Sequence, residues 1–225
     1  MKLLPWQPVC RKKPQPLLNR EEIFTCNVMI WIISSPESIY GEADILMSLL
    51  AAGAHRIILR KPNWHTAQYK TLLDNIAPAC YAQLLIRDQP QLATDYQLAG
   101  VHWSGHTKEQ AVTTPFRENS TGIHHATDIS QMDTRFNTWL LSPVFDSISK
   151  PGYTGKFAAE AITAMPWPQQ GQILALGGVD HNNIHLIKQW RFHGAALLGA
   201  IWRTPEKAVE SYQHIQSLWN RNDPT

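Results

Sequence analysis

The sequence is poor in cysteine and has no long hydrophobic run, and each absence excludes a class of protein. The three cysteines, Cys10, Cys26 and Cys80, show no Cys-x-x-Cys spacing, which argues against a disulfide framework and against a zinc knuckle. The longest apolar stretch, residues 28–33, has the length of a strand, whereas a membrane-spanning helix needs about 20 apolar residues. We therefore expect no transmembrane helix, and a reducing cytoplasm is the simplest compartment.

An excess of charge of one sign is also lacking. The formal net charge is +2, which gives no argument for nucleic acid or a membrane as a partner. The hydrophobic content of 44% is that of a folded protein and excludes a mainly disordered chain. Residues 1–27 differ, because they are basic, rich in proline and without the sustained apolar segment of a signal peptide. We expect a flexible, disordered tail over 1–27 and one folded domain over 28–221.

Short apolar runs alternate with helix-like segments throughout this domain. Residues 45, 46, 49 and 50, and again 208, 212, 215 and 219, fall on one face of a helix. Such alternation is typical of α/β folds, and eight units predict a single compact (β/α)8 TIM barrel. A doubly wound open sheet alternates in the same way and is the competing interpretation. The predicted strands are residues 28–34, 56–59, 82–86, 100–103, 121–124, 139–142, 173–176 and 195–198.

Two glycine-containing turns follow the last two predicted strands. Gly177-Gly178 ends the seventh strand, and Gly199-Ala200 follows the eighth. In barrels the chemistry lies at the carboxyl ends of the strands, and the seventh and eighth loops often bind phosphate. Glycine lets backbone N–H groups approach an oxyanion closely. The pattern predicts a phosphate site, with two ordinary tight turns as the alternative.

The segment after the sixth strand, LSPVFDSISKPGY, combines hydroxyls with one lysine. Ser142 ends the strand, and Ser147, Ser149 and Lys150 precede a Pro-Gly pair. Hydroxyl and ammonium groups are donors that suit phosphate or pyrophosphate. We expect these residues to bind the substrate, although a polar surface loop has a similar composition.

Charged residues follow the second and third predicted strands. Arg60 and Lys61 end one strand, and Arg87 and Asp88 end the next. The cations predict an anion-binding position or else solvated charges at the rim. Asp88 is either part of an ion-paired turn or a ligand of Mg²⁺, which usually requires more than one carboxylate.

Four histidines, at positions 102, 106, 124 and 125, lie at or near strand ends. Imidazole titrates near neutral pH and is suited to general acid–base chemistry. The spacing matches no standard zinc site, so no metal site is predicted. His125, at the end of the fifth strand, is the candidate for a catalytic residue.

The segments IILRKP, GVHWSG, LSPVFDSISKPGY, and ALGGVDHNN followed by GAALLGAI occur in order between residues 29 and 218. Together they resemble the thiamine phosphate synthase and TenI family. This resemblance implies a (β/α)8 barrel. It also implies one of two activities. The synthase joins an aminopyrimidine pyrophosphate to a thiazole phosphate with Mg²⁺, whereas TenI-type members isomerise a thiazole carboxylate phosphate to its aromatic tautomer.

The resemblance implies that the phosphate side of the site is retained. Gly177, Gly178, Gly199 and Ala200 match the family's backbone cradle, with Gly199 in place of a usual serine. The match also assigns phosphate binding to the residues of a Thr-x-Thr-Lys loop in which serines replace both threonines, namely Ser147, Ser149 and Lys150.

The resemblance also implies that the pyrophosphate and magnesium side is altered. Of a Gln-x-Arg-x-Lys segment only Arg60 remains, an Asn-Asp pair reads Arg87-Asp88, and the second magnesium aspartate falls at Thr107. The histidine of the TenI-type tautomerases aligns with His125. A shift of the alignment by one residue would place it at the adjacent His124 instead.

We therefore expect a thiazole tautomerase that needs no cofactor and binds a phosphorylated thiazole. One alternative is a thiamine phosphate synthase that uses Mg²⁺, with Lys61 or Arg87 supplying the missing contacts. Another is a non-catalytic binder of thiazole phosphate or thiamine phosphate. The sequence leaves the oligomeric state open, and a homo-oligomer is among the states that it allows.

Overall fold

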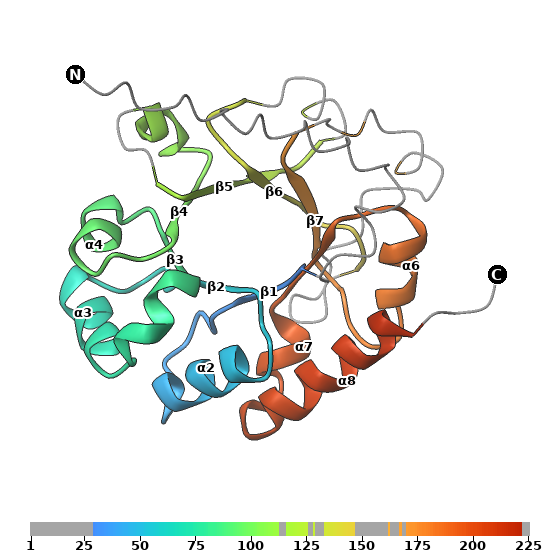
Figure 1. Cartoon of the computed structure of the whole chain (residues 1–225), viewed down its shortest axis with the longest axis horizontal. Helices are drawn as coiled ribbons and strands as arrows, with labels where there is room; N and C mark the ends of the chain where they lie inside the picture. The colour runs from blue at the N-terminus through green and yellow to red at the C-terminus, as the bar shows by residue number, and fades with distance from the viewer. Residues whose placement is uncertain are drawn as a thin grey trace, which may run out of the picture.

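The computed structural model describes residues 29–112, 116–125, 128, 133–146, 162, 167 and 170–221. Eight parallel strands pair in chain order, and β1 also pairs with β8, so the sheet is a closed barrel (Figure 1). Closure confirms the predicted barrel and rules out the open doubly wound sheet. The strands are β1 Met29–Ile33, β2 Arg56–Leu59, β3 Leu84–Arg87, β4 Gly100–Trp103, β5 Glu118–Ile123, β6 Thr138–Leu141, β7 Gln172–Leu176 and β8 Gly194–Leu197.

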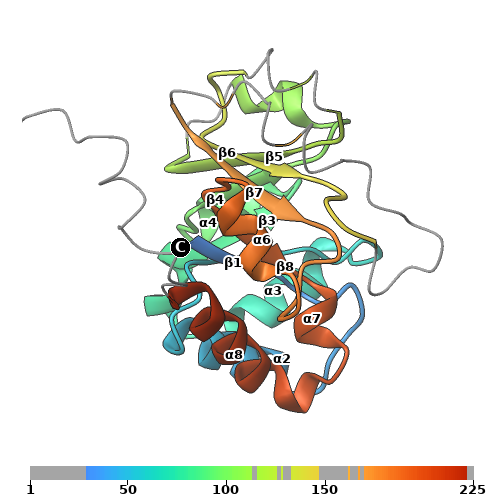
Figure 2. The same cartoon turned by 90° about the vertical axis from the view of Figure 1, so that its right-hand side faces the viewer.

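The described helices lie outside the barrel, around β1 to β4 and around β7 and β8, as Figure 1 shows in a view down the ring of strands. Helix α8 packs against α2, α6 and α7, and the side view in Figure 2 shows α8 beside α2. None of the described helices is long and apolar enough to cross a membrane. The α-helices are α2 Glu42–Ala51, α3 Thr66–Asp74, α4 Pro90–Asp95, α6 Ile184–Gln189, α7 Gly199–Trp202 and α8 Ala208–Asn220. The 3₁₀ helices are η1 Pro78–Gln83, η2 Lys108–Val112 and η4 Pro205–Lys207.

The strands are buried on both faces, which explains their nearly continuous apolar sequences. One face contributes to the core between barrel and helices, with Ile30, Ile57 and Val101 among its members. The other face fills the barrel interior, where Trp31, Ile58 and other apolar side chains form a second cluster. Alternation along each strand therefore determines which residues point into the barrel.

The predicted helical faces are confirmed. The buried side of α8 consists of Ala208, Tyr212, Ile215 and Trp219, which are the residues given by the sequence spacing. On α2 the buried residues are Leu46, Leu49 and Leu50, together with Glu42 at its first position, while the predicted Ile45 is half-buried against the same core. Burial of a glutamate in a helix that faces the core points to a specific partner, described below.

Strand β5 begins at Glu118, three residues before the predicted start at residue 121. The sequence of this strand, ENSTGI, has few apolar residues. Its polar side chains can be buried because they form hydrogen bonds. The indole N–H of Trp103 donates to Asn119 Oδ1 over 2.9 Å, and the Thr121 hydroxyl donates to the Trp103 carbonyl over 2.9 Å. Apolar content alone therefore locates only the end of this strand.

Candidate active site at the carboxyl end of the barrel

Four polar side chains form a row on the inner face of β2 to β5. The register pairs Ile58 with Leu85, which places Arg60 opposite Arg87 two residues further on. Arg87 in turn pairs with His102, and His102 with Ser120. Because Ile58 and Leu85 belong to the interior cluster, alternation directs this row into the barrel near its carboxyl end.

Asp88 follows Arg87 with a φ of 55°, a left-handed conformation that is uncommon outside glycine. Its Oδ1 accepts hydrogen bonds from the Ser104 N–H at 2.8 Å and from the Thr107 hydroxyl, and its Oδ2 accepts from Arg87 Nε at 3.2 Å. Burial acts to raise the pKa of Asp88, but the bonds from Thr107 and Ser104 outweigh burial and leave the pKa below its ordinary value. The carboxylate is therefore ionised and already engaged on both oxygens.

These residues do not fit a magnesium site. Mg²⁺ requires near-octahedral oxygen ligands and usually more than one carboxylate. Here the one carboxylate is engaged by three donors, among them the guanidinium of Arg87. The resemblance implies a second carboxylate at position 107, where this chain has a threonine. Over the described ranges no group of three or more His, Cys, Asp or Glu residues is placed to hold a metal ion.

His102 lies between Arg87 and Ser120 in the inner row. Its Nδ1 is 3.0 Å from the Ser120 hydroxyl oxygen. Burial, together with the charges of Arg87 and Arg60, lowers the pKa of His102 to about 3, against a smaller opposing effect of Asp88. The imidazole is therefore neutral near pH 7 and contributes hydrogen-bonding atoms without charge.

His124 and His125 follow the end of β5, and both are exposed. Ser120 and Gly122 occupy the inner positions of this strand, so alternation places His124 on the same side. The backbone N–H groups of both histidines donate to Asp128 Oδ2, at 3.4 and 3.1 Å, but only His124 is also placed with a ring atom, Nδ1, 3.0 Å from the Ser142 carbonyl oxygen among the described contacts. The structure thus brings His124 to the barrel mouth, and a catalytic role for His125 stays a prediction.

Gly177 and Gly178 follow β7 with φ of 94° and 66°. A Cβ on Gly178 would lie 2.1 Å from the Asp146 carbonyl oxygen, and one on Gly177 would lie 2.9 Å from Pro143 Cα. The loop after β6 therefore packs directly on this turn, and Phe145 donates its N–H to the Gly177 carbonyl over 3.0 Å. The positive φ values and the close packing exclude a side chain at both positions, whether or not these glycines also bind a phosphate.

The remaining predicted phosphate ligands divide into two groups. Gly199 and Ala200 begin α7 directly after β8, so they share the carboxyl end of the barrel with the Gly177-Gly178 turn on the neighbouring strand. The rest lie outside the described residues: Ser147, Ser149 and Lys150.

Lys61 does not share the inner row with Arg60, and its predicted role in substrate binding stays a prediction. Its side chain is fully buried, and its ammonium donates to both carboxylate oxygens of Glu42, at 2.6 and 2.5 Å, and to the Glu37 carbonyl at 2.7 Å. Burial lowers the pKa of Lys61 and raises that of Glu42, and their mutual hydrogen bond opposes both shifts. The partner of Lys61 is 19 residues away in the sequence, so spacing gave no signal for this pair.

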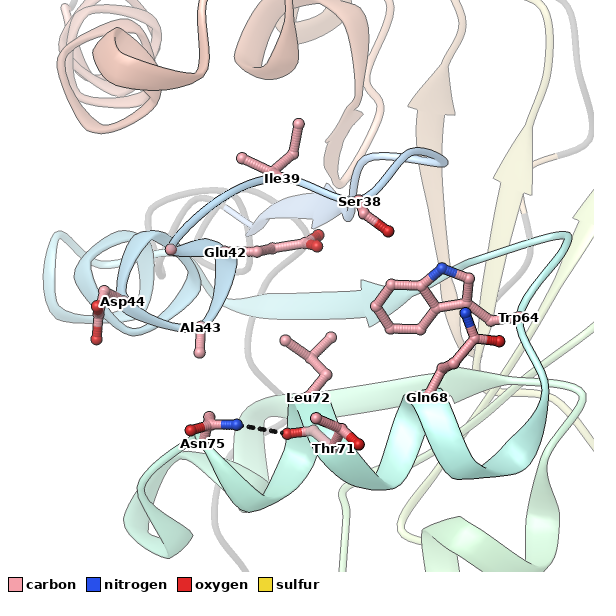
Figure 3. Close-up of a pocket in the computed structure, with 11 residues that line it drawn as sticks. Ser38, Ile39, Glu42, Ala43, Asp44, Trp64, Gln68, Thr71, Leu72 and Asn75 are labelled. Carbon is pink, nitrogen blue, oxygen red and sulfur yellow. Dashed lines mark hydrogen bonds between the residues drawn. The ribbon is translucent and has the colours of Figure 1, made fainter.

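A cavity of about 460 Å³ lies outside the barrel between α2 and α3 (Figure 3). Trp64 forms one wall, and its ring lies 4.7 Å from the Lys61 ammonium. None of the predicted site residues lines this cavity. It is therefore separate from the site at the barrel mouth.

A closed (β/α)8 barrel with cationic and titratable side chains at the carboxyl ends of its strands has the architecture of the barrel enzymes. The chain belongs to the thiamine monophosphate synthase (TMP-TENI) family, whose family model matches residues 30–201. This match confirms the resemblance derived from the sequence motifs. A comparison with curated proteins finds no match.

Solved structures share the fold. A thiamine phosphate pyrophosphorylase from Bacteroides thetaiotaomicron superposes with a TM-score of 0.73 at 18% identity, covering 88% of this chain and 100% of the other. One from Pyrococcus furiosus gives 0.69 at 13% identity, covering 85% and 95%. A 3-hexulose-6-phosphate synthase from Salmonella typhimurium gives 0.59 at 11% identity, covering 85% and 98%. At these identities the similarity establishes the fold alone.

Proposed function

We propose that this protein is a TenI-type isomerase that converts a thiazole carboxylate phosphate into its aromatic tautomer. The observation that carries the proposal is the engagement of Asp88 by Thr107, Ser104 and Arg87. A synthase reaction that expels pyrophosphate with Mg²⁺ needs carboxylate ligands at this position. Tautomerisation moves a proton on a bound ring and needs no metal.

Proton transfer is assigned to an imidazole at the end of β5. Substrate and product are isomers, so the base removes a proton from one ring position and a proton is returned at another, with no net gain or loss. His124 supports this assignment because its Nδ1 lies against the Ser142 carbonyl, which orients the ring at the barrel mouth. His125 is the second candidate, since the resemblance aligns this residue with the TenI histidine.

The phosphate of the substrate is assigned to the loops after β6, β7 and β8. Gly177 and Gly178 lie beside the loop that ends its described part at Asp146, and Gly199 begins the next loop. Hydroxyl, ammonium and backbone N–H donors suit a phosphate dianion. The proposed ligands are Ser147, Ser149, Lys150, Gly177, Gly178, Gly199 and Ala200, with Ser142 beside them as a substrate contact.

A reconstitution assay on the purified protein tests this function. The mixture contains thiazole carboxylate phosphate, aminopyrimidine pyrophosphate and Mg²⁺, and each component is omitted in turn. The proposal expects conversion of the tautomer without pyrimidine and in the presence of EDTA. Abolition of the conversion by EDTA would contradict it.

A thiamine phosphate synthase is the second candidate. It is favoured by the family model, which carries the synthase name, and by retention of one magnesium-type aspartate, Asp88. In the same assay this function predicts thiamine phosphate formation only when pyrimidine and Mg²⁺ are both present. Binding of thiazole phosphate without either activity would indicate a non-catalytic binder.

A further inference from the structure

Arg60 and Arg87 bring two positive charges together inside the barrel mouth. Over the described part of the chain, the Arg60 guanidinium has no hydrogen-bond or ion-pair partner. Burial and the neighbouring charge of Arg87 lower the pKa of Arg60, whereas Tyr69 and Asp88 act in the opposite direction. Half-buried like charges repel each other and lose hydration, so this arrangement favours a bound anion.

Among the described residues, the groups around the two arginines do not neutralise their charge. Asp88 is the acid in contact with Arg87, through one bond from Nε to Oδ2, and its other oxygen is engaged by Thr107 and Ser104. His102, the next residue in the row, is neutral because its pKa is about 3. Two guanidiniums and one carboxylate therefore leave a net charge of about +1 on this part of the barrel wall, by simple addition of unit charges.

The backbone that carries Arg60 is held from two sides. The Ser34 hydroxyl oxygen accepts the Arg60 N–H at 2.8 Å, and the Tyr69 hydroxyl oxygen accepts the Lys61 N–H at 2.8 Å. The buried bond between Lys61 and Glu42 ties the same segment to α2. Such support reduces the entropy lost when Arg60 binds a ligand.

We infer that Arg60 and Arg87 form an oxyanion site that binds the carboxylate or phosphate group of a substrate without a divalent cation. The planar guanidinium pairs with either group through two parallel hydrogen bonds. Arg87 thereby supplies the positive charge that a metal ion supplies in the magnesium-dependent members. The identity of the substrate rests on the proposed function, but the site itself is testable with simple anions.

The experiment is calorimetric titration of the full chain with inorganic pyrophosphate, and separately with thiazole-2-carboxylate, each in EDTA and in Mg²⁺. For wild type, Kd is expected to agree within about twofold between the two conditions. Arg60→Gln and Arg87→Gln are each expected to weaken binding at least about tenfold. The control is Arg117→Gln, an exposed arginine that precedes β5 at the opposite end of the barrel, with an expected change below about twofold.

Three results would overturn the inference: pyrophosphate binding that requires Mg²⁺, binding that both glutamine variants leave unchanged, or no binding of either probe. Circular dichroism and thermal melting establish that each variant is folded. Arg60→Lys and Arg87→Lys provide a second test, because lysine keeps the charge and loses the paired geometry, so intermediate affinity is expected.

The same proteins separate this inference from the proposed function. Anion binding without tautomer conversion would support the oxyanion site and refute the proposed isomerase activity. Tautomer conversion with a KM that Arg60→Gln and Arg87→Gln leave unchanged would support the isomerase activity and refute the oxyanion site. The relative affinities of pyrophosphate and the heteroaromatic carboxylate identify which anionic group the site prefers.

Discussion

The hydroxyl of Thr107 donates a hydrogen bond to Oδ1 of Asp88, although the two residues are 19 positions apart and follow different strands. The resemblance places the family's two magnesium aspartates at these two positions. The structure shows that Thr107 and Asp88 are in direct contact, with a hydroxyl donor where the resemblance implies a second carboxylate. The proposed metal-independent isomerase rests on this contact.

Introducing a second carboxylate beside Asp88 is expected to create a magnesium site. In Thr107→Asp/Arg87→Asn, two carboxylates face each other without the guanidinium, a donor set suited to Mg²⁺. Millimolar Mg²⁺ should then raise the Tm by a few degrees, since a ligand that binds the native state stabilises it. Arg87→Asn alone is the control and should not respond. An equal response in wild type would show that the native site already binds the ion.

Replacing the two adjacent histidines one at a time tests which imidazole moves the proton. Loss of a general acid–base group costs roughly 10²- to 10⁴-fold in rate. We expect His124→Ala to reduce kcat of the tautomer conversion by at least about 100-fold and His125→Ala by less than about tenfold, because His124 contacts the Ser142 carbonyl. A larger loss of kcat in His125→Ala than in His124→Ala would assign the proton transfer to His125. The measurement is kcat and KM of both variants.

His102 is expected to make the protein sensitive to acid. Its pKa is lowered to about 3 in the folded state, against about 6.5 for an unperturbed imidazole. The unfolded chain therefore binds the extra proton between these values, and stability falls as the pH falls from about 6.5 toward 3. His102→Asn should remove about 1 to 2 kcal/mol of the stability lost between pH 7 and 5, as measured by urea unfolding. His106→Asn, an exposed histidine in the following loop, is the control and should lose stability as wild type does.

Gly178 and Gly41 provide a matched pair of substitutions. Both have nearly the same left-handed φ, 66° and 67°, but a Cβ on Gly178 would meet the Asp146 carbonyl at 2.1 Å, whereas Gly41 has nothing within 4 Å. Gly41→Ala should cost about 1 kcal/mol from backbone strain alone. Gly178→Ala should cost about 3 kcal/mol or more, because the loop after β6 must also move. Equal losses in chemical denaturation would show that this loop does not pack on Gly178.

The buried bond between Lys61 and Glu42 is expected to be structural. Lys61→Met leaves the Glu42 carboxylate buried without its partner, which should destabilise the protein by about 3 kcal/mol. Lys61→Met/Glu42→Leu removes both charges and should recover most of that loss. Urea unfolding of the two single variants and the double variant measures the coupling. A large rise in substrate KM in the stable double variant would instead support the prediction that Lys61 binds substrate.

The apolar pattern of the sequence predicts much of the architecture. Strands such as β2 and β4 were predicted to the residue because both of their faces are buried, which makes their apolar runs continuous. The buried face of α8 followed from its helical spacing for the same reason. Strand β5 was predicted only in part, because its polar groups are satisfied by Trp103 and other neighbours that are remote in sequence.

The sequence by itself determined the barrel, the family and the strand ends that carry Arg60, Arg87 and Gly177, since these depend on local pattern and motif. Only the tertiary structure decided which of two adjacent residues enters the barrel. Arg60 belongs to the inner row whereas Lys61 binds Glu42, and His124 rather than His125 meets Ser142. The physical reason is that a shift of one residue along a strand moves a side chain to the opposite face, and the partner that fixes the face comes from a distant segment.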